Sequence, residues 1–595
     1  MKYYNTIVIG TGCAGYNAAD RLFRLGVTDT AIVTEGKNSG TSRNTGSDKQ
    51  TYYKLSLCGS EGDSVRELAE TLYSGGGVMG EHALCEAAYS TRCFMNLVEA
   101  GVPFPCNEFG EYAGYKTDHD PRSRATSAGP LTSKYMTEAL EKKVAANGTE
   151  IIDNTLAVKI LTKDGAVTGL ACVSTETDEF CVYACDNVVL CTGGPAGIYE
   201  NTVYPQSQHG STGLAIEAGA RLSNADQWQY GIASTDFRWN LSGTYQQVLP
   251  RYVSVSEDGD ETEFLYDALG KGSLGLIFLK GYQWPFDSRK TEGSSKIDLL
   301  VAGEIKAGRR VYLDYTRNPK GLEDGFSVLP DEAYSYLERS GALFGTPIER
   351  LEKMNAAAIE LYRDHGIDLY KDRLQIAVCA QHCNGGVDVD LNWQTSVRGL
   401  YCAGEAAGTF GVYRPGGSAL NSTQVGSLRA AEHIARTKKR DRSAPSYALP
   451  DIKYGRSNVK ELLSRIRSDM SRYADFDRNT EKIRETYEKV CRLCDNFENE
   501  AVIADRTELP LYFRLRDAAL TCRSVLSAMI CSSDNVGSHG SAIYDGKPCE
   551  TELRKTRTVT DGARSYIAPV SEMPDPELWF ETLLSRKREE NNGGK

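Results

Sequence analysis

Three glycines near the N-terminus have the spacing of a phosphate-binding turn. Gly10, Gly12 and Gly15 follow an apolar stretch and open a segment with an apolar face. In such a turn the glycines allow a tight bend, a close approach to a diphosphate and the packing of a helix on a strand. Glu35, twenty residues after Gly15, could accept hydrogen bonds from a ribose diol. These residues predict a dinucleotide site without saying which dinucleotide it binds.

The elements that must position these residues form a βαβ unit. Residues 5–10 are typical of a buried parallel strand, 13–25 of a helix and 30–34 of a second strand. Further apolar stretches at 186–192 and 398–404 are typical of additional buried strands. The expected fold class is therefore α/β.

Three later segments carry a resemblance to a known family. They read LCTGG at 190–194, GLYCAGE at 399–405 and RPGGSAL at 414–420. In this order they resemble the flavoprotein subunits of succinate dehydrogenase and fumarate reductase, and L-aspartate oxidase. The resemblance implies that the dinucleotide is FAD and that the fold is Rossmann-like.

The resemblance also implies which residues bind FAD. Glu35 would hold the adenosine ribose, Glu405 the ribityl chain, and Ser418 to Leu420 the flavin ring. A reduced flavin needs N–H donors or a helix N-terminus at its N1/O2 edge, and residues 416–421 lead into a predicted helix. The remaining candidates are Gly10, Gly12, Ala14, Gly15, Ser42, Thr192 and Gly193.

The residue at position 43 indicates whether FAD would be attached covalently. Relatives that attach FAD covalently use a His in a Ser-His-Thr segment, and Arg43 stands at the matching position. Arginine cannot form that bond, so the predicted FAD is non-covalent.

Changes in composition along the chain predict its domains. Residues 225–375 are rich in aromatic residues and loops, and 455–535 read as charged helices. We expect an FAD-binding domain at 1–230 and 376–445, an inserted α+β capping domain at 231–375, and a C-terminal helical domain at 446–595.

The substrate machinery of fumarate-reducing relatives is half present. Arg414 matches their carboxylate-binding Arg. Gln381 stands where they have a His, and His382 comes one residue later. His382 could still reach the site, or the one-residue slip could turn its side chain to the other face of an extended segment. Serines at 294–295, with Lys296 beside them, stand where the proton-donating Arg is expected. These departures favour a substrate other than fumarate.

Two aromatic features leave alternatives open. Tyr413 precedes a Pro-Gly-Gly loop, as in the related ketosteroid dehydrogenases, and could donate to a developing enolate or simply pack. The cap aromatics could line an apolar pocket or form a core; they are Trp228, Tyr230, Trp239, Tyr245 and Trp284.

Together these observations predict an FAD-dependent oxidoreductase that reduces an activated C=C bond, an enoate or enone, with hydride from flavin N5. Arg414, with Tyr413 or His382, would stabilise charge on the substrate, and Lys296 or a tyrosine would protonate it. The alternatives are an FAD dehydrogenase or oxidase, or the flavin subunit of an iron–sulfur complex resembling adenylylsulfate reductase.

The bulk composition limits the partners. The 595 residues carry a net charge of −12, which argues against a nucleic acid or an anionic membrane surface. The sequence shows no export signal and no apolar run long enough for a membrane helix, so we expect a cytoplasmic protein. We predict no metal site. We expect a small-molecule substrate and a separate electron donor, either ferredoxin-like or a flavin carrier.

Overall fold

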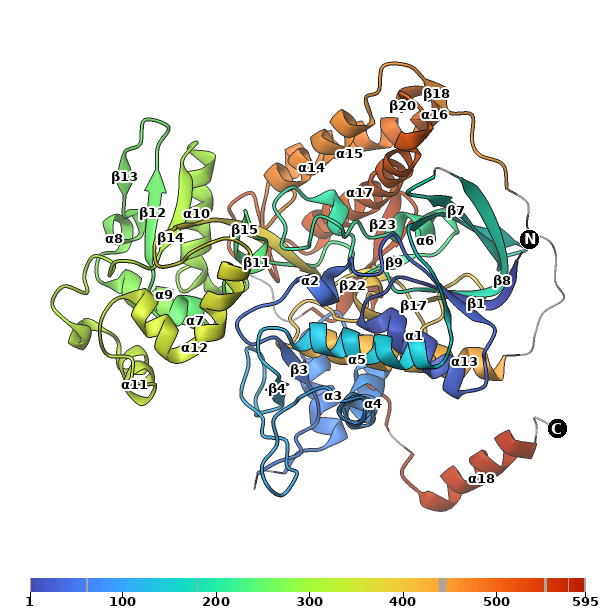
Figure 1. Cartoon of the computed structure of the whole chain (residues 1–595), viewed down its shortest axis with the longest axis horizontal. Coiled ribbons are helices and arrows are strands. Elements are labelled where there is room, and N and C mark those ends of the chain that lie inside the picture. The colour runs from blue at the N-terminus through green and yellow to red at the C-terminus, as the bar shows by residue number, and fades with distance from the viewer. Residues whose placement is uncertain are drawn as a thin grey trace.

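The computed structural model describes residues 2–59, 62–177, 179–437, 445, 447–549, 554–575 and 577–592. Its centre is the strand β1 (Tyr3–Ile9), in which Ile7 and Val8 have no exposed surface. A strand buried on both faces needs helices on both sides, and this accounts for its continuous apolar run. We call the part of the molecule around β1 the body. Figure 1 shows the body beside a separate lobe, which is drawn in green and yellow-green.

The body is built on a seven-stranded sheet. The strands run in the order β5-β2-β1-β8-β7-β6, and β17 pairs with β8. Strands β5, β2, β1, β8 and β17 are parallel, whereas β6 and β7 form an antiparallel meander with β8. The bounds are β2 (Thr30–Val33), β5 (Glu150–Ile152), β6 (Thr155–Lys163), β7 (Ala166–Ser174), β8 (Phe180–Leu190) and β17 (Leu400–Cys402).

Helices cover this sheet and carry the predicted turns. The helix predicted at 13–25 is confirmed as α1 (Cys13–Arg24), and the helix predicted to follow the 416–421 segment is confirmed as α13 (Ser418–Arg436). The two helices pack on each other. The remaining body elements are α2 (Thr41–Asn44), β3 (Thr51–Tyr53), α3 (Val65–Tyr73), α4 (Gly80–Glu99), β4 (Ala125–Ser127), α5 (Thr132–Ala146) and α6 (Thr212–Glu217).

The lobe, here called the cap, runs from the start of β10 to the end of β15. Its antiparallel sheet has the order β11-β10-β15-β14-β12-β13, with β10 (Trp228–Ser234), β11 (Trp239–Asn240), β12 (Arg251–Val255), β13 (Glu261–Thr262), β14 (Arg310–Asp314) and β15 (Leu374–Cys383). Its helices are α7 (Thr244–Gln247), α8 (Phe264–Leu269), α9 (Gly272–Lys280), α10 (Ser295–Lys306), α11 (Asp331–Arg339) and α12 (Pro347–Asp364).

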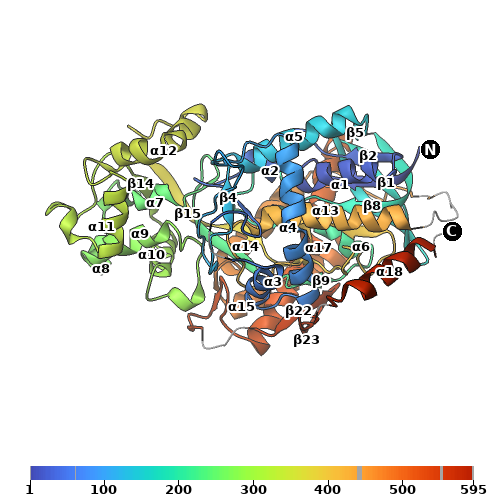
Figure 2. The same cartoon turned by 90° about the horizontal axis from the view of Figure 1, so that it is seen from below.

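The cap is joined to the body by β10 and β15, which pair with each other along most of their length. Figure 2 shows the cap at one end of the molecule from a second direction. The domain boundaries predicted at 231 and 375 fall inside these two strands. The paired strands β10 and β15 therefore belong to both the cap and the body.

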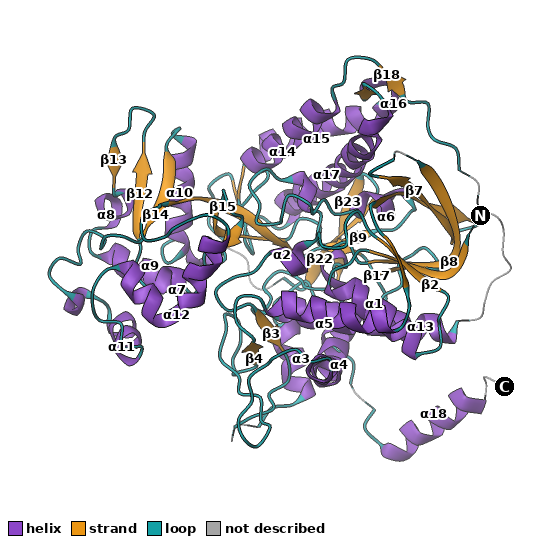
Figure 3. Ribbon diagram, in the orientation of Figure 1, coloured by secondary structure: helices purple, strands orange, loops and turns teal. Residues whose placement is uncertain are grey.

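The C-terminal part is mainly helical, as Figure 3 shows. It contains α14 (Val459–Tyr473), α15 (Thr480–Asp495), α16 (Phe497–Glu500), α17 (Leu509–Asn535) and α18 (Phe580–Asn592). A hairpin of β22 (Thr556–Asp561) and β23 (Arg564–Pro569) adds to the body by pairing with β9 (Leu222–Ser223), which also pairs with β16 (Gly386–Val387). Among the described helices none is long and apolar enough to cross a membrane.

The cap aromatics divide between the two interpretations left open by the sequence. Trp228, Tyr230, Trp239 and Tyr245 lie in the main hydrophobic core, each at most 2% exposed. Trp284 instead lines the large cavity described below. Buried aromatic rings contribute large apolar areas, so the first four stabilise the fold rather than contact a ligand.

A buried carboxylate fastens the cap to the body. Asp48 precedes β3, and its Oδ2 accepts hydrogen bonds from the backbone N–H and the hydroxyl of Thr244 at 2.8 and 3.1 Å. Thr244 is the first residue of α7, so the carboxylate also lies at the positive end of that short helix. Burial nevertheless raises the pKa of Asp48. Nearby, the Asn240 amide donates to the Gly46 carbonyl at 2.9 Å.

Replacing Asp48 by Ala should loosen the cap. The Thr244 N–H then lacks its acceptor, and the free energy of unfolding should fall by about 1–3 kcal/mol. We expect trypsin to cut within the cap faster than in the unaltered protein. Asp48→Asn, which keeps an oxygen at this position, should lose less stability. Equal protease resistance of the alanine variant would show that Asp48 does not hold the cap.

Candidate functional site

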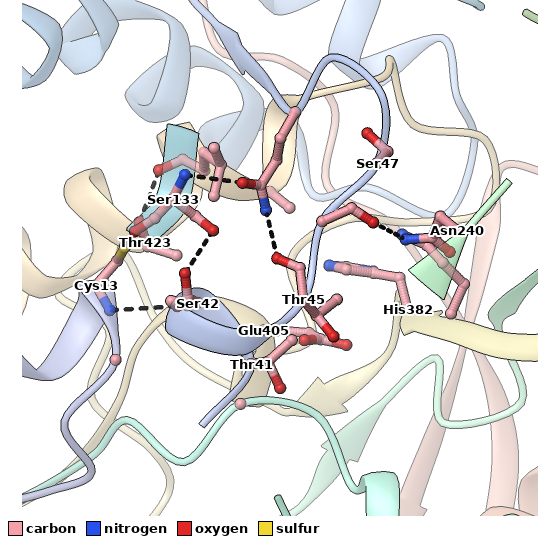
Figure 4. Close-up of a pocket in the computed structure, with 18 of the residues that line it drawn as sticks. Cys13, Thr41, Ser42, Thr45, Ser47, Ser133, Asn240, His382, Glu405 and Thr423 are labelled. Atoms are coloured by element: carbon pink, nitrogen blue, oxygen red, sulfur yellow. Dashed lines mark hydrogen bonds between the residues drawn. The ribbon is translucent and has the colours of Figure 1, made fainter. Parts of the chain in front are cut away.

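One large cavity lies between the body and the cap. Its volume is about 820 Å³, and both parts contribute to its lining. Figure 4 shows the α2 segment, with Thr41, Ser42 and Thr45, facing His382 and Asn240 across it, while Glu405 lies close by. Most of the predicted cofactor residues line it: Gly10, Gly12, Ala14, Glu35, Ser42, Thr192, Gly193, Glu405 and Leu420.

The predicted phosphate-binding turn has the close packing that its glycines allow. A Cβ at Gly15 would lie 2.0 Å from the Gly10 carbonyl oxygen, and one at Gly10 would lie 2.5 Å from the Cys191 carbonyl oxygen. Gly12 caps α1 without a side chain, so the first turn keeps backbone N–H groups for an anion. The Cys13 N–H is 3.3 Å from the Ser42 hydroxyl. This cradle fits the diphosphate of FAD.

Glu35 lies just after β2 and has a partner that the sequence analysis missed. The Nε of Arg514, on α17, donates to Glu35 Oε2 at 2.9 Å. The two residues are 479 positions apart, so no local pattern could have indicated the pair. The ion pair with Arg514 fixes the orientation of the Glu35 carboxylate, which would accept hydrogen bonds from the ribose.

Glu405 follows β17, and one of its oxygens is held by two donors. The Tyr204 hydroxyl and the Cys383 backbone N–H, the latter at 2.9 Å, both donate to Glu405 Oε1. Burial raises the pKa of this carboxyl. Glu405 also lines the cavity, so its carboxyl group is placed to accept a hydrogen bond from a hydroxyl chain.

The N-terminus of α13 points its dipole at the cavity. Gly417, its N-cap, has a left-handed φ of +92°, and Gly417 and Leu420 line the cavity. Ser418 is buried and lies outside that lining, against a small separate pocket. The N–H groups of Ser418 and Leu420 donate to the carbonyls of Pro415 and Gly417, both at 3.2 Å, so it is the positive end of the helix dipole that suits the N1/O2 edge of a flavin.

A β-bulge decides how β15 faces the cavity. Gln229 of β10 pairs with His382 and Tyr230 pairs with Ala380, which leaves Gln381 as the extra residue. A bulge locally reverses the alternation of side chains, and Gln381 and His382 both line the cavity. Of the two alternatives left open for His382, the structure therefore has the one in which its side chain reaches the cavity despite the one-residue slip.

His382 and Arg414 meet through one amide. Asn384 Oδ1 lies 3.0 Å from His382 Nδ1 and 3.3 Å from Arg414 Nε. Burial lowers the pKa of Arg414 to about 10, and burial with the nearby Arg414 charge lowers the pKa of His382 well below its usual value. The site thus holds a guanidinium cation beside a neutral imidazole.

The other two predicted catalytic residues lie elsewhere. The Tyr413 hydroxyl accepts a hydrogen bond from the Gly540 N–H at 2.9 Å, and its ring lies 3.6 Å from the Arg289 guanidinium. Lys296 lies in the first turn of α10, 3.6 Å from Glu292. Neither Tyr413 nor Lys296 is among the cavity-lining residues.

The cap contributes aromatic as well as polar side chains to the cavity lining. The Phe, Tyr and Trp residues among them are Phe278, Tyr282, Trp284 and Tyr336. The Trp284 indole N–H donates to the Ile232 carbonyl at 2.9 Å, so its ring is fixed. Within the described ranges no group of three His, Cys, Asp or Glu residues could hold a metal ion.

Comparisons with known proteins agree with this geometry. The chain matches the family model described as "FAD binding domain" over residues 5–420. A fumarate reductase (CoM/CoB) subunit of Methanothermobacter marburgensis is 26% identical over 471 residues, 77% of each chain. An L-aspartate oxidase of Agrobacterium fabrum is 25% identical over 441 residues, 72% of this chain and 73% of that protein.

Solved structures share the fold. A chain of the E. coli quinol fumarate reductase has a TM-score of 0.71 at 16% identity, covering 97% of this chain and 98% of that one. The adenylylsulfate reductase of Archaeoglobus fulgidus has a TM-score of 0.64 at 15% identity, covering 97% of each. The predicted α/β fold, the family resemblance and the FAD cofactor are confirmed.

Gly15→Ala should abolish FAD binding. The new Cβ meets a backbone oxygen, which cannot move without opening the turn. We expect purified protein with less than about a tenth of the normal flavin, measured as visible absorbance per chain. Gly303→Ala on α10 is the matched control, because a Cβ there would meet nothing within 4 Å. A fully yellow Gly15→Ala protein would contradict this assignment.

Proposed function

Because this chain belongs to the FAD binding domain family and is an FAD-dependent oxidoreductase, we propose that it reduces an activated C=C bond, that of an enoate or enone. The observation that carries the proposal is the placement of Arg414 and His382 together in the cavity that contains the dinucleotide cradle. A cation paired with a polar acceptor is suited to an alkene that bears a carboxylate or carbonyl group.

Arg414 would stabilise the charge that develops during reduction. When bound and reduced by the electron donor, the flavin would supply a hydride from its N5 atom. Arg414 makes one hydrogen bond to the described residues, through Nε, so its terminal N–H groups are left for a substrate oxygen. A preorganised buried cation interacts more strongly with growing negative charge than one in water does.

A cap tyrosine is our candidate for the proton donor. Tyr282 lines the cavity, and its hydroxyl donates to Glu332 Oε1 at 2.6 Å. Glu332 is exposed, so this pair links the cavity with solvent. Lys296, the other sequence candidate, does not line the cavity and is paired with Glu292.

The exclusion of fumarate that the sequence favoured has lost one of its grounds. It rested partly on Gln381 replacing a His, and the bulge returns His382 to the cavity. The names of the relatives give it no support either, since one of them is a fumarate reductase. Fumarate therefore belongs among the compounds to be tested.

We also propose a separate protein as the electron donor, an iron–sulfur protein or a flavin carrier. The M. marburgensis relative is named as one subunit of its enzyme, which supports an assembly for that protein and motivates the proposal here. A flavin-reducing partner would leave the cavity free for the alkene.

The deciding experiment follows the flavin directly. The holoenzyme is reduced with dithionite under anaerobic conditions and mixed with crotonate-type enoates, cyclic enones or fumarate. At least one alkene should reoxidise the flavin much faster than buffer, with the saturated product found by mass spectrometry. If no alkene does so, the proposed reaction is refuted.

Arg414→Lys should slow this reoxidation by about 10²–10³-fold, because lysine cannot reproduce the two-nitrogen geometry of the guanidinium terminus. FAD content should stay normal, since Arg414 lies outside the phosphate-binding turn. Arg465→Lys, at an exposed pair with Glu461, is the control and should leave the rate unchanged. Equal rates for the two variants would remove Arg414 from the mechanism.

We propose further that FAD is held without a covalent bond. Arg43 turns to α5, where its guanidinium contacts Glu141 at 2.5 Å and Glu138 at 3.7 Å, and it does not line the cavity. Acid precipitation of the holoenzyme should release all flavin into the supernatant and leave a colourless pellet. Flavin fluorescence retained on the denatured chain would disprove this.

A further inference from the structure

Two hydrogen-bonding neighbours fix the orientation of the Asn384 amide, because one of them can only accept and the other can only donate. It has no exposed surface, and its Nδ2 donates to the Val412 carbonyl at 3.1 Å, which can only accept. Its Oδ1 faces Arg414 Nε at 3.3 Å, which can only donate. Both contacts require the same orientation of the amide.

This orientation determines the tautomer of His382. Since Asn384 Oδ1 is an acceptor, the nitrogen 3.0 Å away, His382 Nδ1, must carry the hydrogen. Burial and the Arg414 charge keep the ring neutral by lowering its pKa. His382 Nε2 therefore has a bare lone pair.

No residue that the structure describes donates a hydrogen bond to this lone pair. His382 Nε2 is buried and has no hydrogen-bond partner among the residues that the structure describes, although the ring lines the cavity. An unsatisfied buried acceptor is costly, so a ligand that donates to it is favoured over one that does not. Phe410 packs edge-on against the ring, with centroids 4.8 Å apart, and keeps it in place.

We propose that Asn384 is a positioning residue that presents His382 Nε2 as a hydrogen-bond acceptor, and that the substrate carries an O–H or N–H donor in addition to the carboxylate or carbonyl bound by Arg414. The inference rests on the proposed function and narrows its substrate class to hydroxylated or amino-substituted enoates and enones. A second ionised carboxylate offers no donor, so a simple dicarboxylate is a poor match.

Pairs of substrates that differ only in the donor test the substrate class. Hydroxycrotonate is compared with methoxycrotonate, and a longer hydroxyhexenoate with its methyl ether, as oxidants of the reduced holoenzyme. The hydroxylated member of at least one pair should have a kcat/KM roughly tenfold or more above its ether. In His382→Leu the ratio should fall towards one. Equal or reversed preference in the unaltered enzyme overturns the substrate class.

The role of Asn384 is tested without turnover. The chain has seven histidines, so ¹⁵N-histidine NMR of the FAD-loaded protein is tractable, with His382→Gln identifying the signal of interest. We expect a neutral ring protonated at Nδ1. Asn384→Leu should allow the other tautomer, whereas Asn384→Asp, which keeps an acceptor, should preserve the first. A proton on Nε2 in the unaltered protein, or no change in Asn384→Leu, overturns the inference.

The two proposals fail in different ways. If no alkene reoxidises the flavin, the proposed reaction is refuted, and the NMR experiment still tests whether Asn384 sets the tautomer of His382. If ethers react as well as alcohols, the reaction stands and the donor requirement falls.

Discussion

The contact between Gly15 and the Gly10 carbonyl is the constraint on which the site depends. At 2.0 Å for a hypothetical Cβ, no side chain fits, so α1 can lie directly against the end of β1. This closeness gives the helix N-terminus a clear approach to a diphosphate. Because the diphosphate is the middle of FAD, a cofactor held there would extend towards Glu35 in one direction and towards Glu405 and α13 in the other.

The parts of the fold that the sequence predicted are those with local signals. The glycine turn, α1 and α13 each follow from spacing or periodicity within about twenty residues. The bulge at Gln381 could not be predicted, because it exists only through the pairing of β15 with a strand about 150 residues earlier. Arg514 was missed for the same reason. Tyr413 has the expected sequence context, but it does not line the cavity, and its hydroxyl accepts a hydrogen bond from Gly540 of the C-terminal part.

The C-terminal part completes the site from a distance. Arg514 pairs with Glu35 at the cavity, Gly540 donates to the Tyr413 hydroxyl, and the hairpin β22–β23 pairs with β9 of the body. The C-terminal part therefore contacts the body at residues from three separate stretches of the chain.

The bulge in β15 has a consequence for how such a site can diverge. Side chains on a regular strand alternate with a period of two, so loss of the single extra residue would restore regular pairing and leave only one of Gln381 and His382 facing the cavity. Deletion of one codon there would leave a single side chain, either the amide or the imidazole, where both now line the cavity. Chemical diversity could thus arise in this scaffold from a change of length rather than a change of residue.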